Sequence, residues 1–174
     1  MRITTNIERR NMITITEYAD VLGGLKEIVH EQPAGLSDDE LLIQPPHGGN
    51  CMAWVLGHLA NNLVTIQQKV LGGQVPNGLP DFSRFGYGSK PVLGKEEGLP
   101  SLEMFINSID QLHAAIADQL KSMREEDFDE EIAVIRERTQ RRGYWALFFL
   151  FHHSYHTGQL EFLRNLAGHT EHII

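Results

Sequence analysis

The chain has 174 residues, 41% hydrophobic and 22% charged, which is the composition of one ordinary globular domain. Its 15 lysines and arginines against 23 aspartates and glutamates give a net charge of −8, which argues against a nucleic-acid-binding surface. A single cysteine excludes an internal disulfide framework, and the longest apolar stretch, residues 144–151, is too short to cross a bilayer. We therefore expect a cytoplasmic protein with no nucleic-acid partner and no membrane partner.

The first helix is predicted by a Thr-x-x-Glu capping box at residues 14–17, followed by apolar residues at helical spacing as far as Val29. A second box, at residues 37–40, predicts a short helical turn that two following prolines must end. Residues 1–11 precede the periodic segments, so we expect them to form a loose N-terminal extension. The domain is predicted over residues 12–168, with a C-terminal tail at residues 169–174.

A second long helix is predicted over residues 50–71, closed by two glycines. The connection that follows, residues 72–100, contains seven glycines and four prolines and is too long for a simple turn. It is expected either to be disordered or to pack as a lid through Phe82, Phe85 and Tyr87. The sequence leaves both alternatives open.

The third helix is predicted to begin at Ser101 and to carry an apolar stripe as far as Met123. Residues 124–142 are dense in charge and are predicted to be a solvated connection. The last helix is predicted over residues 143–167, and no alternating run of residues predicts a strand. Four amphipathic helices with one long crossover between the second and the third predict an all-α fold, a four-helix bundle.

The last helix carries two of the nine histidines on one face. His152 and His156 share this face with Trp145, Phe149 and Gln159, because these residues follow each other at spacings of three and four. Two imidazoles one turn apart can converge on a single metal ion. The alternative is a pair of core or interface histidines that are satisfied by hydrogen bonds.

A third histidine, His58, lies in the middle of the second helix, at the border of its apolar stripe. Asn62 follows one turn later on the same face and is expected to orient the imidazole or to contact a ligand. Gln159 and Trp54 are further candidates for contacts around the site. His47, in the loop before the second helix, is a candidate at its mouth.

The remaining chemistry-bearing residues are predicted to have structural roles. His153 is rotated by about 100° from its neighbour on the helix and is expected in the core or at an interface. Cys51 is expected to be a small packed residue, and Gly158 to mark a close helix contact. Four other histidines are predicted to lie at the surface or at helix ends: His30, His113, His169 and His172.

Two segments of the sequence resemble a known family. The residues PPHGGN (45–50), followed by WVLGHLA (54–60), resemble the start of the second helix in the DinB/YfiT-like metal-binding proteins. The residues HHSYHTGQL (152–160) resemble the closing pattern of that family, His-x-x-x-His-x-Gly-Gln-Leu. The resemblance covers the whole chain in order. Thr157 stands where many members carry arginine, so an anion contact at that position is in doubt.

The resemblance implies an up-down-down-up bundle that holds a divalent metal ion, Zn or Ni, through His58, His152 and His156. Three imidazoles leave one coordination position open, as in catalytic metal sites. Characterised relatives imply a thiol S-transferase that acts on a small-molecule substrate with a low-molecular-weight thiol, and a hydrolase is the main rival. No protein side chain is assigned as catalytic, because the metal-bound water or thiol would be the nucleophile.

Other classes of function remain open or are disfavoured. A non-catalytic metal- or ligand-binding bundle with a stress or sequestration role is the main alternative, and a metal-free structural dimer is the other. A zincin would carry glutamate where His153 stands, and a ferritin-like di-iron site would need a second Glu-x-x-His motif besides Glu27 and His30. The apolar run at residues 144–151 presents two helix faces, which favours a homodimer.

Overall fold

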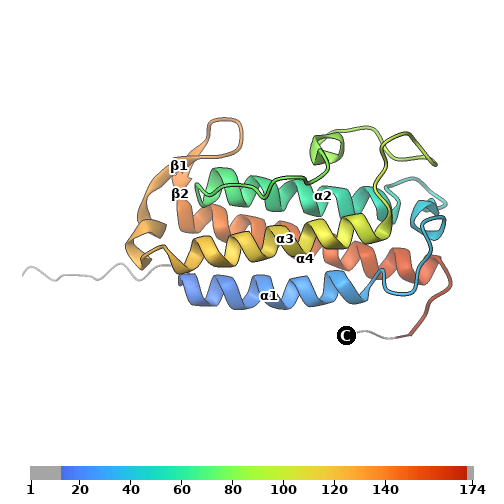
Figure 1. The fold of residues 1–174 in the computed structure, drawn as a ribbon, viewed down its shortest axis with the longest axis horizontal. Coiled ribbons are helices and arrows are strands. Elements are labelled where there is room, and N and C mark those ends of the chain that lie inside the picture. Colours follow the sequence, from blue (N-terminus) through green and yellow to red (C-terminus); the bar gives the residue numbers. More distant parts are fainter. Residues whose placement is uncertain (1–12, 172–174) are drawn as a thin grey trace, which may run out of the picture.

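Four long helices lie side by side in the computed structural model, which describes residues 13–171 (Figure 1). The predicted N-terminal extension and His172 fall outside the described residues. Within residues 13–171, no helix combines the length and the apolar character needed to cross a membrane. The helices are α1 (Ile15–Glu31), α2 (Met52–Thr65), α3 (Leu102–Lys121) and α4 (Arg142–Leu166).

Both predicted capping boxes are present. At the start of α1 the Thr14 hydroxyl accepts a hydrogen bond from the Glu17 backbone, and the Glu17 carboxylate accepts one from the Thr14 backbone at 2.8 Å. Ser37 and Glu40 make the same reciprocal pair before a short 3-10 helix, η1 (Glu40–Leu42). These local contacts satisfy backbone donors that have no helical partner.

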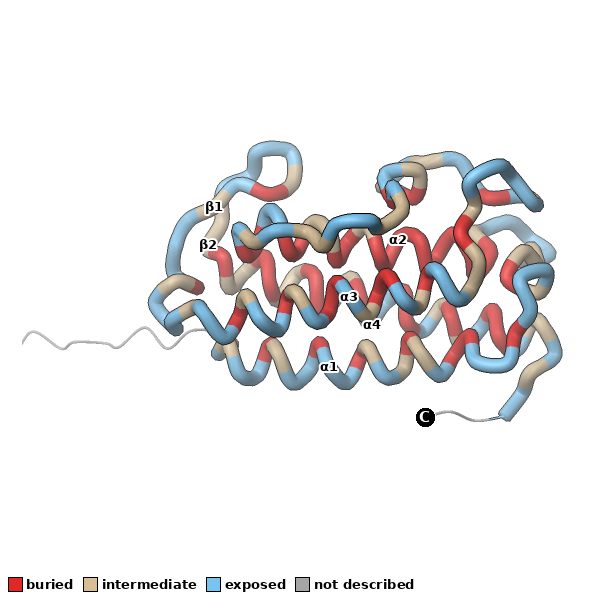
Figure 2. Tube along the Cα trace, in the orientation of Figure 1, coloured by how far each residue is buried: buried red, intermediate tan, exposed pale blue. Residues whose placement is uncertain are grey.

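The core lies between the facing sides of the four helices, where the buried residues line up (Figure 2). Helices α1 and α2 each pack against α3 and α4. The protein is therefore predominantly helical, as predicted. The largest fully buried side chains come from all four helices and from the three connections between them: Tyr18, Leu41, Met52, Leu56, Leu59, Leu63, Ile66, Phe85, Phe105, Ile109, Phe128 and Trp145.

The crossover after α2 packs on the bundle. Helix α2 continues into a π-helical turn, η2 (Ile66–Val70), and the chain then returns through a 3-10 helix, η3 (Phe82–Phe85). Phe82 and Phe85 are buried against Phe105 of α3, at ring-centroid distances of 6.3 and 5.8 Å. Tyr87 is 87% exposed and does not join them. Of the two alternatives for residues 72–100, the packed one is therefore observed, with two anchoring aromatic rings instead of three.

The prediction of a connection without strands at residues 124–142 is wrong. This segment contains a 3-10 helix, η4 (Glu125–Asp129), and an antiparallel pair, β1 (Glu131–Ala133) and β2 (Thr139–Arg141), in which Ile132 faces Gln140. Strands of three residues are too short to show an alternating pattern. The turn between them has positive φ at Arg136 and Glu137, 49° and 56°. The residue pair that usually marks such a hairpin turn in a sequence is Asn-Gly, and this chain has Arg-Glu there instead.

Two buried side chains of α4 hold this hairpin. The guanidinium of Arg142 donates hydrogen bonds to the backbone oxygens of Asp127 and Val70 and pairs with the Glu130 carboxylate. The Trp145 indole donates to the Ile132 carbonyl at 3.1 Å. The hairpin is therefore attached to the start of α4 and to the end of α2.

The prediction that His113 lies at the surface is also wrong. Its side chain is 7% exposed on α3 and makes an edge-to-face contact with the fully buried His153, at a ring-centroid distance of 6.1 Å. Burial lowers the pKa of His113 to about 4, and the positive charges of Lys26 and His30 add to this effect against the opposing Asp110. His113 therefore stays neutral in the folded protein at neutral pH.

Replacement of His113 by leucine is expected to flatten the pH dependence of stability. Because the pKa is about 4 when folded and about 6.5 when unfolded, the unfolded chain binds the extra proton between these pH values. Above pH 6.5 the titration of His113 does not change the free energy of unfolding. As the pH falls from 6.5 to about 4, it lowers the free energy of unfolding by an increasing amount. Urea unfolding of His113→Leu between pH 4 and 6.5 should give a slope smaller by about 1 kcal/mol per pH unit. His47→Gln, at an exposed histidine, is the control, and an unchanged slope in His113→Leu would contradict the assignment.

Candidate metal centre

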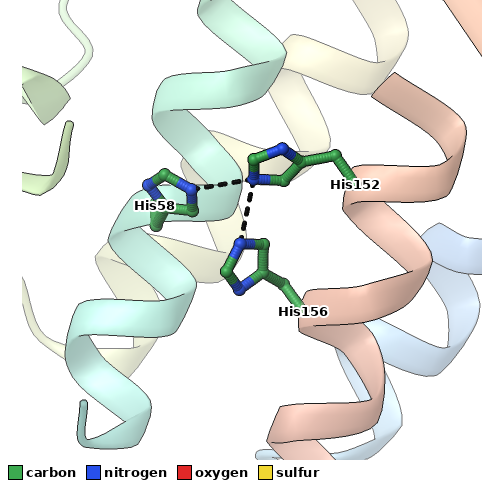
Figure 3. Close-up of side chains that lie close together, drawn as sticks. All are labelled: His58, His152 and His156. Atoms are coloured by element: carbon green, nitrogen blue, oxygen red, sulfur yellow. Dashed lines mark hydrogen bonds between the residues drawn. The ribbon is translucent and has the colours of Figure 1, made fainter. Parts of the chain in front are cut away.

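Three histidines from two helices meet at one point between α2 and α4 (Figure 3). The Nε2 atom of His152 lies 3.0 Å from Nε2 of His58 and 2.9 Å from Nε2 of His156. All three candidate ligand atoms lie within 4.8 Å of one another. Two nitrogen ligands of a tetrahedral ion lie about 3.3 Å apart, so these spacings are close to those of a metal site. The group could hold a metal ion.

The second ring nitrogen of two of these histidines faces a fixed acceptor. Nδ1 of His58 lies 2.7 Å from the backbone oxygen of Phe85, and Nδ1 of His156 lies 2.7 Å from Oε1 of Gln159. A carbonyl oxygen only accepts, so Nδ1 must carry the proton in both neutral rings. Each Nε2 is then left with its lone pair directed at the common point, which is the tautomer that a metal ligand needs.

The contact between Phe85 and His58 depends on a glycine. A Cβ atom at Gly57 would lie 2.4 Å from the Phe85 ring, closer than side chains tolerate. Gly57 therefore lets η3 pack directly against α2, and this close approach brings the Phe85 carbonyl to the imidazole of the next residue. Sequence reasoning did not identify Phe85 as part of the site; the glycine directly before His58 was the available signal.

Trp54 supports the same imidazole from another side. Its ring stacks on His58 with a centroid distance of 4.7 Å and an interplanar angle of 15°. The indole nitrogen donates to the Ser89 hydroxyl at 3.0 Å, so the tryptophan is itself held by the crossover. His58 is only 3% exposed and is fixed by one hydrogen bond and one stacking contact.

Burial keeps these three histidines neutral. Desolvation lowers the pKa of His156 to about 4, although the hydrogen bond to Gln159 opposes it. Desolvation also lowers the pKa of His58 and of His152, and the neighbouring His58 charge adds to the effect on His152. Neutral imidazole is the form that binds metals, so the site is prepared for a cation at neutral pH.

The other candidates from the sequence lie at different distances from the centre. Gln159 contacts His156, as described, and Trp54 contacts His58. Asn62 is buried near His58, but within the part of the chain described its amide makes no hydrogen bond to His58 or to the other two histidines of the centre. His47 is exposed and does not line the recesses beside the three histidines. Gly158, expected at a close helix contact, has nothing within 4 Å of a Cβ position.

Two recesses reach the centre from the surface. The larger has a volume of about 730 Å³ and is lined by α2, α4 and the hairpin, with His58 and His152 in its wall. The smaller, of about 450 Å³, is lined by all three histidines together with side chains of α2, the crossover and α4. The centre is therefore open through two recesses, of which only the smaller is lined by all three histidines.

The replacement Gly57→Ala is expected to weaken both the fold and Zn²⁺ binding. The new methyl group must displace the Phe85 ring, which should lower the free energy of unfolding by about 1–3 kcal/mol and reduce metal affinity about 10- to 100-fold. Gly158→Ala is the matched control, since it adds a methyl group in open space and should stabilise α4 by up to about 1 kcal/mol. Chemical unfolding and competitive Zn²⁺ titration measure the two effects. Parental zinc affinity in Gly57→Ala would contradict the role given to Phe85.

The replacement Gln159→Leu is expected to reduce Zn²⁺ affinity about 10-fold or more without loss of helix content, because the acceptor that orients His156 is removed. Gln159→Glu keeps an acceptor oxygen and should restore most of the affinity. Competitive zinc titration and circular dichroism check this pair, and equal affinity in both variants would show that the contact does not orient the ring.

Comparisons with known proteins establish the fold and the family of this chain. A crystal structure of a conserved protein from Enterococcus faecalis is similar, with a TM-score of 0.64 and 16% sequence identity, over 89% of this chain and 98% of that chain. At this identity the likeness shows the fold alone. A comparison with curated proteins finds no match. A family model for the DinB superfamily matches residues 31–160, well over half of the sequence, and the chain therefore belongs to the DinB superfamily.

Proposed function

We propose that this protein is a metal-dependent enzyme that holds Zn²⁺ or Ni²⁺ through His58, His152 and His156 and acts on a small molecule. The observation that carries the proposal is the pair of fixed acceptors, Phe85 and Gln159, which leave two Nε2 lone pairs at one point. No fourth histidine, cysteine or carboxylate among residues 13–171 completes this group. Three protein ligands with an accessible fourth position are typical of catalytic metal sites.

The reaction we favour is transfer to a thiol, with hydrolysis as the rival. When bound, a divalent ion would supply Lewis-acid chemistry that lowers the pKa of a thiol or of water. None of the described residues that line the two recesses is an aspartate or a glutamate, so no carboxylate is placed there as a general base. This favours a nucleophile that is activated at the metal position over one activated by a side chain.

The protein's own residues orient the ligands and limit the access of water. Trp54 stacks on His58 and Phe149 contacts His152, and both aromatic side chains are almost fully buried. A low-polarity surrounding strengthens electrostatic contacts between substrate and protein. His152 is the partly exposed member of the three and lies at the wall that both recesses share.

The order of the helices is part of the proposal. In Figure 1 the colours of α1 and α4 progress along the bundle in one direction, and those of α2 and α3 in the other, which supports the up-down-down-up order of the family. The cytoplasmic location and the homodimer stay predictions. For the dimer, the aromatic side chains of Phe151, Tyr155 and Phe162 on α4 are exposed and available for a contact between copies.

The first test is the metal content of the purified, untagged protein. Elemental analysis should find about one equivalent of Zn or Ni in the parent and none in the variant His152→Ala/His156→Ala, because two of three ligands are lost. Circular dichroism should show the same helix content for both proteins. Absence of metal from the parent, even after reloading with Zn²⁺ and Ni²⁺, would mean that the histidines only pack.

Activity separates the enzyme from a binding or sequestration protein. The metal-loaded protein is expected to conjugate low-molecular-weight thiols to a model electrophile faster than the His58→Ala variant does. A panel of esters and amides tests hydrolysis in parallel. Bound metal without either activity would favour the non-catalytic bundle.

A further inference from the structure

We propose, on the basis of the function proposed above, that the larger recess beside the histidines binds an organic anion: a substrate with an apolar body and a carboxylate or phosphate group. The apolar wall is formed by Trp145, Phe148 and Phe149 of α4 and by Val134 and Ile135 of the hairpin. Trp145 and Phe149 are 2% and 3% exposed, so this wall is part of the packed core and is already formed without a ligand.

Positively charged side chains lie at the rim of the same recess. The recess is lined by Lys69 of η2 and by Arg136 and Arg138 of the hairpin. None of the three makes an ion pair with a carboxylate of residues 13–171. The five other arginines in the described part of the chain each pair with an aspartate or glutamate: Arg84, Arg124, Arg141, Arg142 and Arg164.

This difference carries weight because the protein is acidic. With 23 carboxylates for 15 lysines and arginines, acidic partners are plentiful, and yet two arginines and a lysine without a described acidic partner gather around one recess. A guanidinium group offers a planar pair of donors that matches a carboxylate or a phosphate. The missing partner of this cluster is therefore an anion that the ligand brings.

Aromatic contacts position both arginines. Arg138 lies over the Tyr144 ring at 5.3 Å and Arg136 over the Tyr87 ring at 5.8 Å, measured to the ring centroids. Stacking uses the face of the guanidinium group and leaves its N–H donors at the edge available. Glu137, the carboxylate nearest to them in the sequence, does not line the recess.

The remaining polar side chains that α2 contributes to the larger recess, besides His58, are uncharged: Asn61, Asn62 and Thr65. The smaller recess differs: it is lined by all three histidines, but its described wall contains no lysine or arginine. The cationic character thus belongs to one approach to the site only.

The test compares matched ligands that differ in one group. Metal-loaded protein is titrated calorimetrically with 4-phenylbutyrate, 4-phenylbutyl phosphate, the neutral 4-phenylbutanol and inorganic phosphate. We expect the two organic anions to bind about 10-fold or more tightly than the alcohol and than inorganic phosphate, because they alone use both the rim and the wall. Which of the two binds more tightly identifies the anionic group. Equal affinity for the acids and the alcohol would overturn the proposal.

The variant Arg136→Gln/Arg138→Gln should lose about 10- to 100-fold in affinity for the organic anions and keep its affinity for the alcohol. The variant Lys95→Gln/Lys121→Gln changes the net charge equally at two exposed lysines outside the recess and should bind as the parent does. Unchanged anion affinity in the double arginine variant would overturn the proposal.

Metal content separates this proposal from the function on which it rests. Elemental analysis should give the same metal occupancy in the parent and in both double variants, since none of the four replaced residues is a histidine of the centre. Anion binding that disappears when the metal is removed, but is insensitive to the arginine replacements, would place the anion on the metal and overturn the proposal. Arginine-dependent binding to a protein that holds no metal would support the anion site while the proposed function fails.

Discussion

The hydrogen bond between Nδ1 of His58 and the backbone oxygen of Phe85 is the contact on which the metal centre depends. It sets the tautomer of the one histidine that comes from α2, and it can form only because Gly57 carries no side chain where the Phe85 ring packs. Phe85 in turn packs on Phe105 of α3, so the orientation of one imidazole is tied to the core through two aromatic rings. The residue that packs into the core through its ring, Phe85, is therefore also the residue that orients His58 through its backbone oxygen.

Burial of the histidines has a cost as well as a use. Desolvation lowers the pKa of all three members of the centre, and it also lowers the pKa of His113 and His153, which lie in the core outside the centre. Neutral imidazoles at the centre are ready to bind a cation. The neutral imidazoles of His113 and His153 in the core have no such binding role. Nε2 of His113 and both ring nitrogens of His153 have no hydrogen-bond partner in the described structure. The structure offers no physical reason for histidine at those two positions.

Two of the three connections between the helices provide the surroundings of the site. The crossover brings the Phe85 carbonyl to His58 and Ser89 to Trp54, while the hairpin brings its arginines to the larger recess. Helices α2 and α4 supply all three histidines and a rigid frame. Loops placed in this way can change which ligand is bound while the helices keep the histidines in place, because a fold does not fix the function that its loops carry.

The sequence by itself determined the helices and two capping boxes, because helical periodicity and local hydrogen bonds act over a few residues. Periodicity put His152 and His156 on one helix face, and only the resemblance to the family added His58 to them. The sequence also placed Gln159 near the site, one turn from His156. Only the tertiary structure decided that Phe85 orients His58, that His113 is buried, and that a hairpin forms at residues 131–141. The first two depend on chain segments far apart in sequence that pack against each other, and the residues alone carry no periodic signal for such contacts. The hairpin is local, but its strands of three residues are too short to show an alternating pattern.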